Sequence, residues 1–237
     1  MGRREAFGAL AATAGLVWTA ACGESSSTTA TEVPSTTSAR ALTGSCAVAA
    51  EETAGPYPDR LGMLSNKAFF RRDIREGRSG ALLNLTLTVT NVRDNCSPVV
   101  NANVEIWQCD ASGDYSEYAQ PGYDGTGQTF LRGLQTTDAK GNVAFTTVYP
   151  GWYAGRATHI HVKVYVNGTA VKTTQIAFPE NITAEVYASG VYASKGQSPT
   201  KNASDSVFAD GTTTEMASVS GSADVGFDAS LTVGVSV

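Results

Sequence analysis

The sequence predicts an all-β protein, a single β-sandwich of mostly antiparallel strands with long loops and little helix. Apolar and polar residues alternate over residues 83–90, with the two-residue period of a half-buried strand. Further runs of β-forming composition lie at residues 104–107, 143–148, 159–166, 171–178 and 231–235. Turn sequences such as Lys140-Gly141-Asn142 separate these runs. Two packed sheets bury one face of so many short strands.

The first 22 residues are typical of an export signal. Arg3 and Arg4 precede an apolar run over residues 7–21, which is too short to span a membrane. The sequence Thr19-Ala20-Ala21-Cys22 resembles a bacterial lipoprotein processing site, although Thr19 stands where Leu is usual. We expect cleavage before Cys22 and lipidation there, after export by the twin-arginine or the general secretory route. The protein would then lie on the outer face of the bacterial cell membrane as a lipoprotein, or be secreted.

Composition divides the rest of the chain into two parts. Residues 23–45 are rich in Ser, Thr and Ala and contain no aromatic residue, which predicts a flexible tether. Residues 46–237 are long enough for one domain with a substantial core. Within this domain we expect a short helix at residues 184–187 and a Thr-, Ser- and Gly-rich loop over residues 209–224 before the final strand.

The strand at residues 159–166 carries the only two histidines of the chain, His159 and His161. Side chains two apart on a strand share a face, so both imidazoles project together, opposite Ile160 and Val162. Imidazole is the commonest metal-ligating side chain, so this pair predicts a metal site. Two histidines are too few for sites built on three or more imidazoles. A carboxylate could complete a two-His-one-carboxylate Fe(II) site, whereas tyrosinate ligands would favour ferric iron.

Short motifs surround the histidines in a fixed order between about residues 51 and 180. They are Glu-Thr-Ala-Gly-Pro-Tyr (52–57), Ile-Trp-Gln (106–108), Gly-Asp-Tyr (113–115), Thr-Asp-Ala-Lys-Gly (137–141), Pro-Gly-Trp-Tyr (150–153) and Thr-Gln (174–175). The ordered set resembles the intradiol ring-cleavage dioxygenases, which include protocatechuate 3,4-dioxygenase and catechol 1,2-dioxygenase. The chain also resembles the secreted bacterial branch of that family.

The resemblance implies a set of metal ligands. In the family, two tyrosines and two histidines hold one non-haem Fe(III) per chain, and the matching residues here are Tyr115, Tyr153, His159 and His161. Three further tyrosines lie close enough in the sequence to compete as ligands: Tyr118, Tyr123 and Tyr149.

The resemblance also implies catalytic and substrate-binding residues. Tyr153 would act as a base when it leaves the iron, Arg156 would stabilise charge on the substrate, and Gln175 would orient the substrate or O2. The segment that borders the substrate corresponds to Gly55, Pro56 and Tyr57.

The implied reaction is intradiol cleavage of catechol-type aromatic diols by O2 to cis,cis-muconate-type dicarboxylates, in extracellular aromatic catabolism. The partners are therefore a small aromatic diol and O2. The loop between Tyr153 and Arg156 is shorter than in cytoplasmic relatives, and a long helical N-terminal extension is lacking. We expect a shallower, more open pocket and a monomer or weak homodimer.

Cysteine usage agrees with an oxidising compartment. Apart from Cys22, the chain contains Cys46, Cys96 and Cys109, an odd number that predicts one disulfide and one free thiol. Cys46 precedes the Gly55 segment and Cys109 lies near Tyr115, so we expect both to approach the site. This favours a Cys46–Cys109 bridge, with Cys46–Cys96 as the alternative. The spacings do not resemble those of a zinc site.

Charge and composition restrict the class of partner. The net charge is −5, with acidic residues scattered rather than clustered, which argues against nucleic acid. Contact with a membrane is expected only through the lipid anchor. Two other functions remain open at this point. One is a lipid-tethered, non-enzymatic β-sandwich binding module, and the other is a two-His-one-carboxylate Fe(II) oxygenase.

Overall fold

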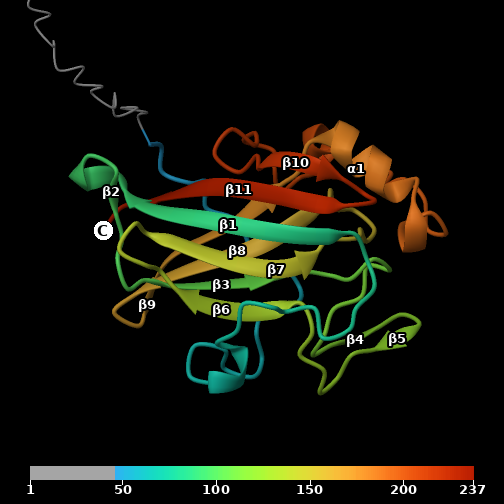
Figure 1. Cartoon of the computed structure of the whole chain (residues 1–237), viewed down its shortest axis with the longest axis horizontal. Coiled ribbons are helices and arrows are strands. Elements are labelled where there is room, and N and C mark those ends of the chain that lie inside the picture. The colour runs from blue at the N-terminus through green and yellow to red at the C-terminus, as the bar shows by residue number, and fades with distance from the viewer. Residues whose placement is uncertain (1–45) are drawn as a thin grey trace, which may run out of the picture. The chain divides into compact units, whose positions relative to one another are not determined.

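The computed structural model describes residues 46–237, which form two packed sheets (Figure 1). The predicted all-β sandwich is confirmed. The predicted export signal and tether, including Cys22, lie outside the described residues. The first sheet consists of β1 (Leu82–Asn91), β2 (Ser97–Pro98), β7 (Asn142–Val148), β10 (Ser218–Ser222) and β11 (Gly226–Val235). The second sheet consists of β3 (Asn103–Trp107), β6 (Arg132–Thr136), β8 (His159–Val166) and β9 (Thr169–Ala177).

The remaining elements are short. Strands β4 (Ala119–Gln120) and β5 (Tyr123–Asp124) form a separate two-stranded ribbon, and α1 (Glu180–Tyr187) is the α-helix of the described residues. The 3-10 helices are η1 (Lys67–Phe69), η2 (Val92–Asp94), η3 (Gly190–Tyr192) and η4 (Asn202–Ser204). No helix within residues 46–237 is long and apolar enough to cross a membrane.

The core lies between the two sheets. Leu83, Leu85 and Leu87 of β1 are buried and belong to the same cluster as Ile160 and Val162 of β8. These are the apolar positions of the alternating patterns in the sequence. The inward faces of the predicted strands are therefore the faces that the structure buries.

The longer strands that the composition did not indicate are β10 and β6, beside the two-residue strands β2, β4 and β5. β10 (Ser218–Ser222) lies in the segment predicted as a loop, and it has only one large apolar residue, Val219. It forms because it pairs antiparallel with β11, a contact between strands that its own composition does not encode. β6 is likewise formed by pairing with β3. The predicted helix at residues 184–187 exists but begins earlier, at Glu180.

One pair of strands in the first sheet is parallel. β1 pairs with β11 over the full register from Leu83–Phe227 to Asn91–Val235, while β7 and β2 pair antiparallel with β1. Figure 1 shows β1 and β11 side by side along the sheet. The last strand of the chain therefore lies inside the sheet, between β1 and β10.

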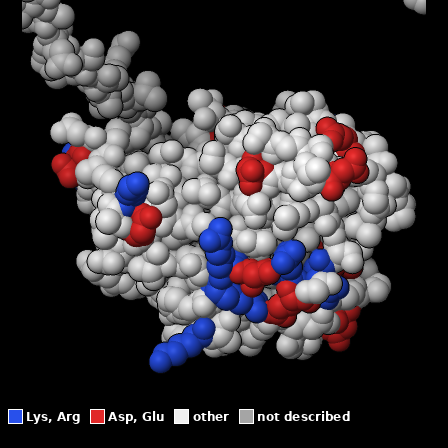
Figure 2. All heavy atoms as spheres, in the orientation of Figure 1, with Lys and Arg blue, Asp and Glu red and all other residues white. Residues whose placement is uncertain are grey.

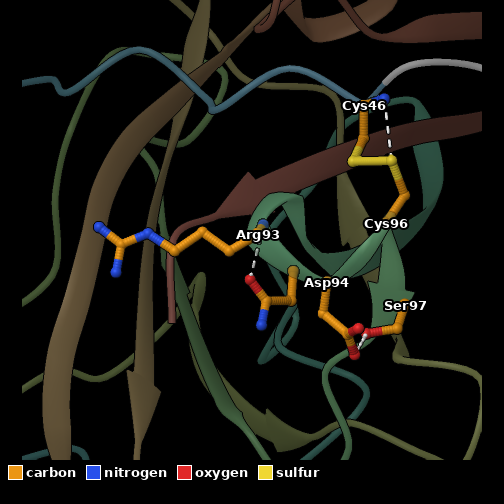
Figure 3. Close-up of a disulfide and its surroundings, with 6 residues drawn as sticks. Cys46, Arg93, Asp94, Cys96 and Ser97 are labelled. Atoms are coloured by element: carbon orange, nitrogen blue, oxygen red, sulfur yellow. Dashed lines mark hydrogen bonds between the residues drawn. A yellow bond between two sulfur atoms is a disulfide. The ribbon is translucent and has the colours of Figure 1, made fainter.

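The disulfide joins Cys46 to Cys96, with their Cα atoms 5.7 Å apart. Figure 3 shows the bond beside η2. The predicted Cys46–Cys109 bridge is therefore wrong, and the alternative pairing is the one formed. Cys46 lies nine residues before Gly55, a separation that an extended chain spans in about 30 Å. Approach of Gly55 to the site thus does not bring Cys46 there. Cys109 is a buried free thiol, and burial raises its pKa to about 12.

Charged side chains outside the core are largely mixed in sign. In the segment before β1, Arg71 pairs with Glu76 and Arg75 pairs with Asp73. Figure 2 shows that blue and red groups lie side by side on the face in view, and that most of this face carries no charged side chain. The face thus presents no extended area of one sign.

Candidate metal centre

The register of β3, β8 and β9 aligns three side chains of the candidate site in one row. Trp107 pairs with His161 across β3 and β8, and His161 pairs with Gln175 across β8 and β9. Their neighbours along the strands, such as Ile106 and Val162, point to the opposite face and pack in the core. The alternation seen in the sequence therefore places the imidazoles away from the sandwich core.

The two imidazoles lie against each other and are both buried. The Nε2 atoms of His159 and His161 are 3.2 Å apart, and the Trp107 ring stacks on His161 at 4.6 Å between centroids. His159 Nδ1 lies 2.7 Å from the carbonyl oxygen of Ala157, so we assign the proton to Nδ1 and a lone pair to Nε2. Burial, reinforced by Arg156, lowers the pKa of His159 to about 3. Burial also holds the pKa of His161 well below its usual range. Both rings are thus neutral at pH 7, which is the metal-binding form.

Two phenols complete the cluster. The Tyr153 hydroxyl lies 3.3 Å from His159 Nε2, and the rings of Tyr153 and Tyr115 are 5.7 Å apart. Tyr115 is fully buried and its hydroxyl has no hydrogen-bond partner. Burial raises the pKa of Tyr153 to about 12 and that of Tyr115 well above its usual range. An unpartnered buried hydroxyl beside two neutral imidazoles is the arrangement that a bound cation would satisfy.

The three tyrosines that compete in the sequence have other partners. Tyr118 donates to the Pro58 carbonyl at 2.8 Å, and the Tyr149 hydroxyl lies 2.8 Å from that of Thr183. The Tyr123 hydroxyl is engaged by Gln128, at 2.9 Å. The structure therefore brings Tyr115 and Tyr153 to the histidines and directs these other hydroxyls elsewhere.

Arg156 lies next to the cluster and is held by a residue that sequence reasoning missed. Its Nε donates to both oxygens of the buried Asp205 carboxylate, at 2.9 and 3.1 Å, and its Nη2 donates to Gln175 Oε1 at 2.5 Å. Nη1 lies 3.4 Å from His159 Nε2. Asp205 also accepts from the Ala157 backbone, at 2.7 Å. Asp205 is 49 residues from Arg156 and belongs to no motif, so nothing in the sequence indicated it.

Gly55 reaches the site in a conformation that favours glycine. Its φ is +67°, and a Cβ at this position would lie 2.9 Å from Cε1 of His161. Gln175 Nε2 donates to the Thr53 carbonyl at 2.9 Å, which ties the same segment to β9. The predicted substrate-bordering segment is thus held against the imidazole pair, with Pro56 following Gly55 in the chain.

Tyr57 lines a cleft beside the cluster. Its ring stacks on Tyr115 at 4.6 Å between centroids and meets the Tyr153 ring edge-on at 5.9 Å. Tyr57 and Tyr153 both border a cleft of about 460 Å³, a volume typical of small-molecule sites. Trp152 and Lys195 also line this cleft.

A buried arginine, also missed from the sequence, supports the loop that carries Tyr115. Arg132 on β6 donates to the hydroxyl and the carbonyl of Ser116, both at 2.9 Å, and to the Tyr57 carbonyl at 3.0 Å. It pairs with Glu117 at 3.4 Å, and the side chains of both residues are almost completely buried. Arg132 therefore joins the Tyr115 loop to the segment that supplies Tyr57.

No carboxylate joins the imidazole pair. Among residues 46–237, the only group of three or more His, Cys, Asp or Glu ligand atoms within 4.8 Å of one another contains no histidine. Asp205, which is near, is engaged by Arg156. The geometry therefore does not support a two-His-one-carboxylate site.

Comparison with known proteins agrees with the fold and the cluster. A family profile described as Dioxygenase matches residues 65–202. The solved intradiol ring-cleavage dioxygenase from Tetranychus urticae is 28% identical, with a TM-score of 0.73 over 81% of this chain and 95% of that chain. The dioxygenase domain of a dioxygenase carbohydrate-binding protein fusion from Streptomyces sp. SirexAA-E is 25% identical, with a TM-score of 0.57 over 81% and 99% of the two chains. A search of curated protein sequences finds no match.

A more distant structure shares the fold. Hydroxyquinol 1,2-dioxygenase from Pseudomonas putida DLL-E4 is 17% identical, with a TM-score of 0.58 over 81% of this chain and 68% of that chain. The profile match over residues 65–202 and the likeness to the Tetranychus urticae enzyme show that the chain belongs to the intradiol ring-cleaving dioxygenases. Members of this family are oxidoreductases that bind non-haem iron, so a non-enzymatic binding module is excluded.

Proposed function

We propose that this protein cleaves catechol-type aromatic diols between the two hydroxyl-bearing carbons, on one non-haem Fe(III) held by Tyr115, Tyr153, His159 and His161. The observation that carries the proposal is the convergence of two neutral imidazoles and two phenols, one of which is buried without a hydrogen-bond partner. Fe(III), a hard and highly charged ion, suits phenolate ligands. Both atoms of O2 enter the cis,cis-muconate-type dicarboxylate, so no further reductant is needed.

Bound Fe(III) would supply a Lewis acid that holds the diol and the phenolates in their anionic forms. The side chains of the two tyrosines differ in how freely they can move. Tyr115 is fully buried under Tyr57, whereas Tyr153 is only partly buried and borders the cleft. Tyr153 is therefore the phenol that can move toward the substrate and accept a proton at its hydroxyl oxygen. Arg156 favours the anionic form of Tyr153, because its positive charge opposes the rise of that pKa.

The remaining residues bind and orient the substrate. The guanidinium of Arg156 is fixed by Asp205, so its positive charge stays near the imidazole pair and can stabilise negative charge on the diol. Gln175 connects Arg156 to the Thr53 carbonyl, so it positions the guanidinium as well as facing the site. The aromatic walls of the cleft, including Tyr57 and Trp152, suit a flat ring.

The visible spectrum of the purified protein tests this proposal. We expect a red-brown tyrosinate-to-Fe(III) band that moves to longer wavelength when catechol is added without O2. Tyr153→Phe should alter the band and slow catechol-dependent O2 uptake. As a matched control, Tyr165→Phe removes a phenol outside the cluster and should leave the band unchanged. A protein that stays colourless after reconstitution with ferric iron would contradict the proposal.

We further propose that the reaction takes place outside the cytoplasm. The basic and apolar N-terminal sequence and the Cys22 processing motif support export, and a disulfide is expected to persist in an oxidising compartment. Mass spectrometry of the protein from membranes should find a diacylglyceryl adduct on Cys22, and Cys22→Ser should release the protein into the soluble fraction. An unmodified, full-length chain in the cytoplasm would contradict export.

A further inference from the structure

Three carboxylates converge at a second place in the fold. Glu52, Asp210 and Glu215 each offer a carboxylate oxygen, and these oxygens all lie within 4.8 Å of one another. Glu52 belongs to the segment that runs along β9, where its backbone N–H donates to the Thr173 carbonyl at 2.8 Å. Asp210 and Glu215 belong to the loop between η4 and β10. The cluster therefore joins segments that are far apart in the sequence.

Glu215 is buried with an unused acceptor. Glu215 is 0% exposed. Its Oε1 accepts a hydrogen bond from the Thr174 hydroxyl at 3.3 Å, and its Oε2 has no hydrogen-bond partner. The backbone holds it there, because Ala177 donates to the Glu215 carbonyl at 2.9 Å. A buried carboxylate oxygen without a partner is costly, so this position indicates a missing positive group.

The described chain does not supply that positive group. Within residues 46–237, none of the three carboxylates forms an ion pair. The nearby cations have other partners, since Lys172 pairs with Glu51 and Arg156 pairs with Asp205.

The clustering also raises the pKa of Glu215 and of Glu52. Burial, with Glu52 and Asp210 as neighbours, raises the pKa of Glu215 to about 7. Burial and Asp210 raise the pKa of Glu52 against the opposing influence of Arg156. Negative charge therefore accumulates here as the pH rises, and within residues 46–237 no cation forms an ion pair with it.

We propose that Glu52, Asp210 and Glu215 form a second metal site that binds one Ca²⁺ and is separate from the proposed iron ligands. The donors are hard oxygens with no imidazole or thiolate, which selects Ca²⁺ or Mg²⁺ over transition metals. Ca²⁺ accepts about six to eight oxygen ligands in a flexible geometry, whereas Mg²⁺ requires near-ideal octahedral geometry at about 2.1 Å, so carboxylates from separate segments suit Ca²⁺ better. Asp210 is exposed, so water can complete the coordination.

The site would also fasten the segment that holds Arg156. Asp205 lies on the same connection as Asp210 and Glu215, between η4 and β10. A Ca²⁺ ion would tie this connection to the segment of Glu52 on the other side. Binding should therefore protect residues 205–216 from proteolysis.

Calorimetric titration of the full-length protein with CaCl2 at pH 7.5 tests the site directly. We expect one ion per chain, a dissociation constant of roughly 10⁻⁵–10⁻³ M, and a higher melting temperature. Asp210→Asn, at an exposed position that should not disturb folding, should weaken binding at least about tenfold. Glu215→Gln should abolish binding and raise the melting temperature in calcium-free buffer.

Glu51→Gln is the matched control, because it removes the neighbouring charge outside the cluster and should leave calcium affinity unchanged. Absence of heat and of any melting shift would overturn the proposal and assign a shared proton to the carboxylates. Equal affinity in Asp210→Asn would overturn it as well, and a response to MgCl2 alone would overturn the choice of Ca²⁺. None of these readouts depends on diol cleavage, so this inference and the proposed function fail independently.

Discussion

Gly55 controls how closely the segment before Tyr57 can approach His161. Its positive φ and the 2.9 Å contact that a Cβ would make with His161 both restrict the position to glycine. Gly168 provides a comparison that separates the backbone strain from the contact. Its φ is +77°, but no atom lies within 4 Å of an added Cβ.

Gly55→Ala should therefore lower iron affinity as well as stability. Backbone strain should cost about 1–3 kcal/mol in Gly55→Ala and Gly168→Ala alike. Only Gly55→Ala should displace the imidazole and reduce the iron bound per chain, as measured by metal analysis after dialysis. Full iron occupancy in Gly55→Ala would show that the His161 ring can move without loss of the site.

Asp205 acts through Arg156 and is a positioning residue. Asp205→Asn keeps the shape and one acceptor but removes the negative charge that pairs with the guanidinium. Loss of such supporting partners typically costs about 10- to 100-fold in activity or metal affinity. We expect a fall of that size in kcat/KM for catechol with the tyrosinate band retained. An unchanged kcat/KM would mean that Gln175 alone holds Arg156 in place.

At this scale the sequence predicted the residues that strand alternation and motifs can reveal. His159 and His161 share a face because they are two apart, and the motif order indicated Tyr115 and Tyr153. The roles of Asp205 and Arg132 could not be predicted. Each contacts the site through a residue that is far away in the sequence and shares no local pattern with it. From the sequence alone, a charged residue outside a recognised pattern is predicted to lie exposed at the surface.

The strands also divide into those that their own sequence predicts and those that depend on contacts with distant residues. Strands with their own alternation, such as β1 and β8, could be predicted, whereas β10 and β6 exist because a neighbouring strand pairs with them. The disulfide prediction was wrong for a related reason. It assumed that Cys46 lies at the site because Gly55, which follows it in the sequence, does. In fact Cys46 lies beside η2, at the end of β1.

Thiol counting checks the corrected disulfide. In a Cys22→Ser background, denatured without reductant, Cys109→Ser should expose no reactive thiol and Cys96→Ser should expose two. The Cys46–Cys96 bridge closes a loop of 50 residues and should contribute about 4 kcal/mol to the free energy of unfolding. Urea unfolding with and without reductant measures that contribution. No reactive thiol in Cys96→Ser would restore the Cys46–Cys109 pairing.

For the whole molecule, Glu215 links stability to pH. Its pKa is about 7 in the folded protein, against an ordinary value of 4.5, so the folded state binds this proton more tightly than the unfolded state. The free energy of unfolding should then fall as the pH rises from about 4.5 to 7, by up to about 3 kcal/mol in calcium-free buffer. Urea unfolding across this range should show the decline in the wild type and a smaller one in Glu215→Gln. An equal decline in both proteins would place the effect on other groups.

The parallel pairing of β1 with β11 also sets an order in time. β1 leaves a ribosome or an export channel long before residues 226–235 exist outside it, and until then one edge of β1 has no partner. The first sheet can therefore close only after residues 226–235 have been made, whatever the earlier strands have already formed. Until residues 226–235 emerge, the nascent chain exposes one unpaired edge of an apolar strand, to which chaperones can bind during that interval.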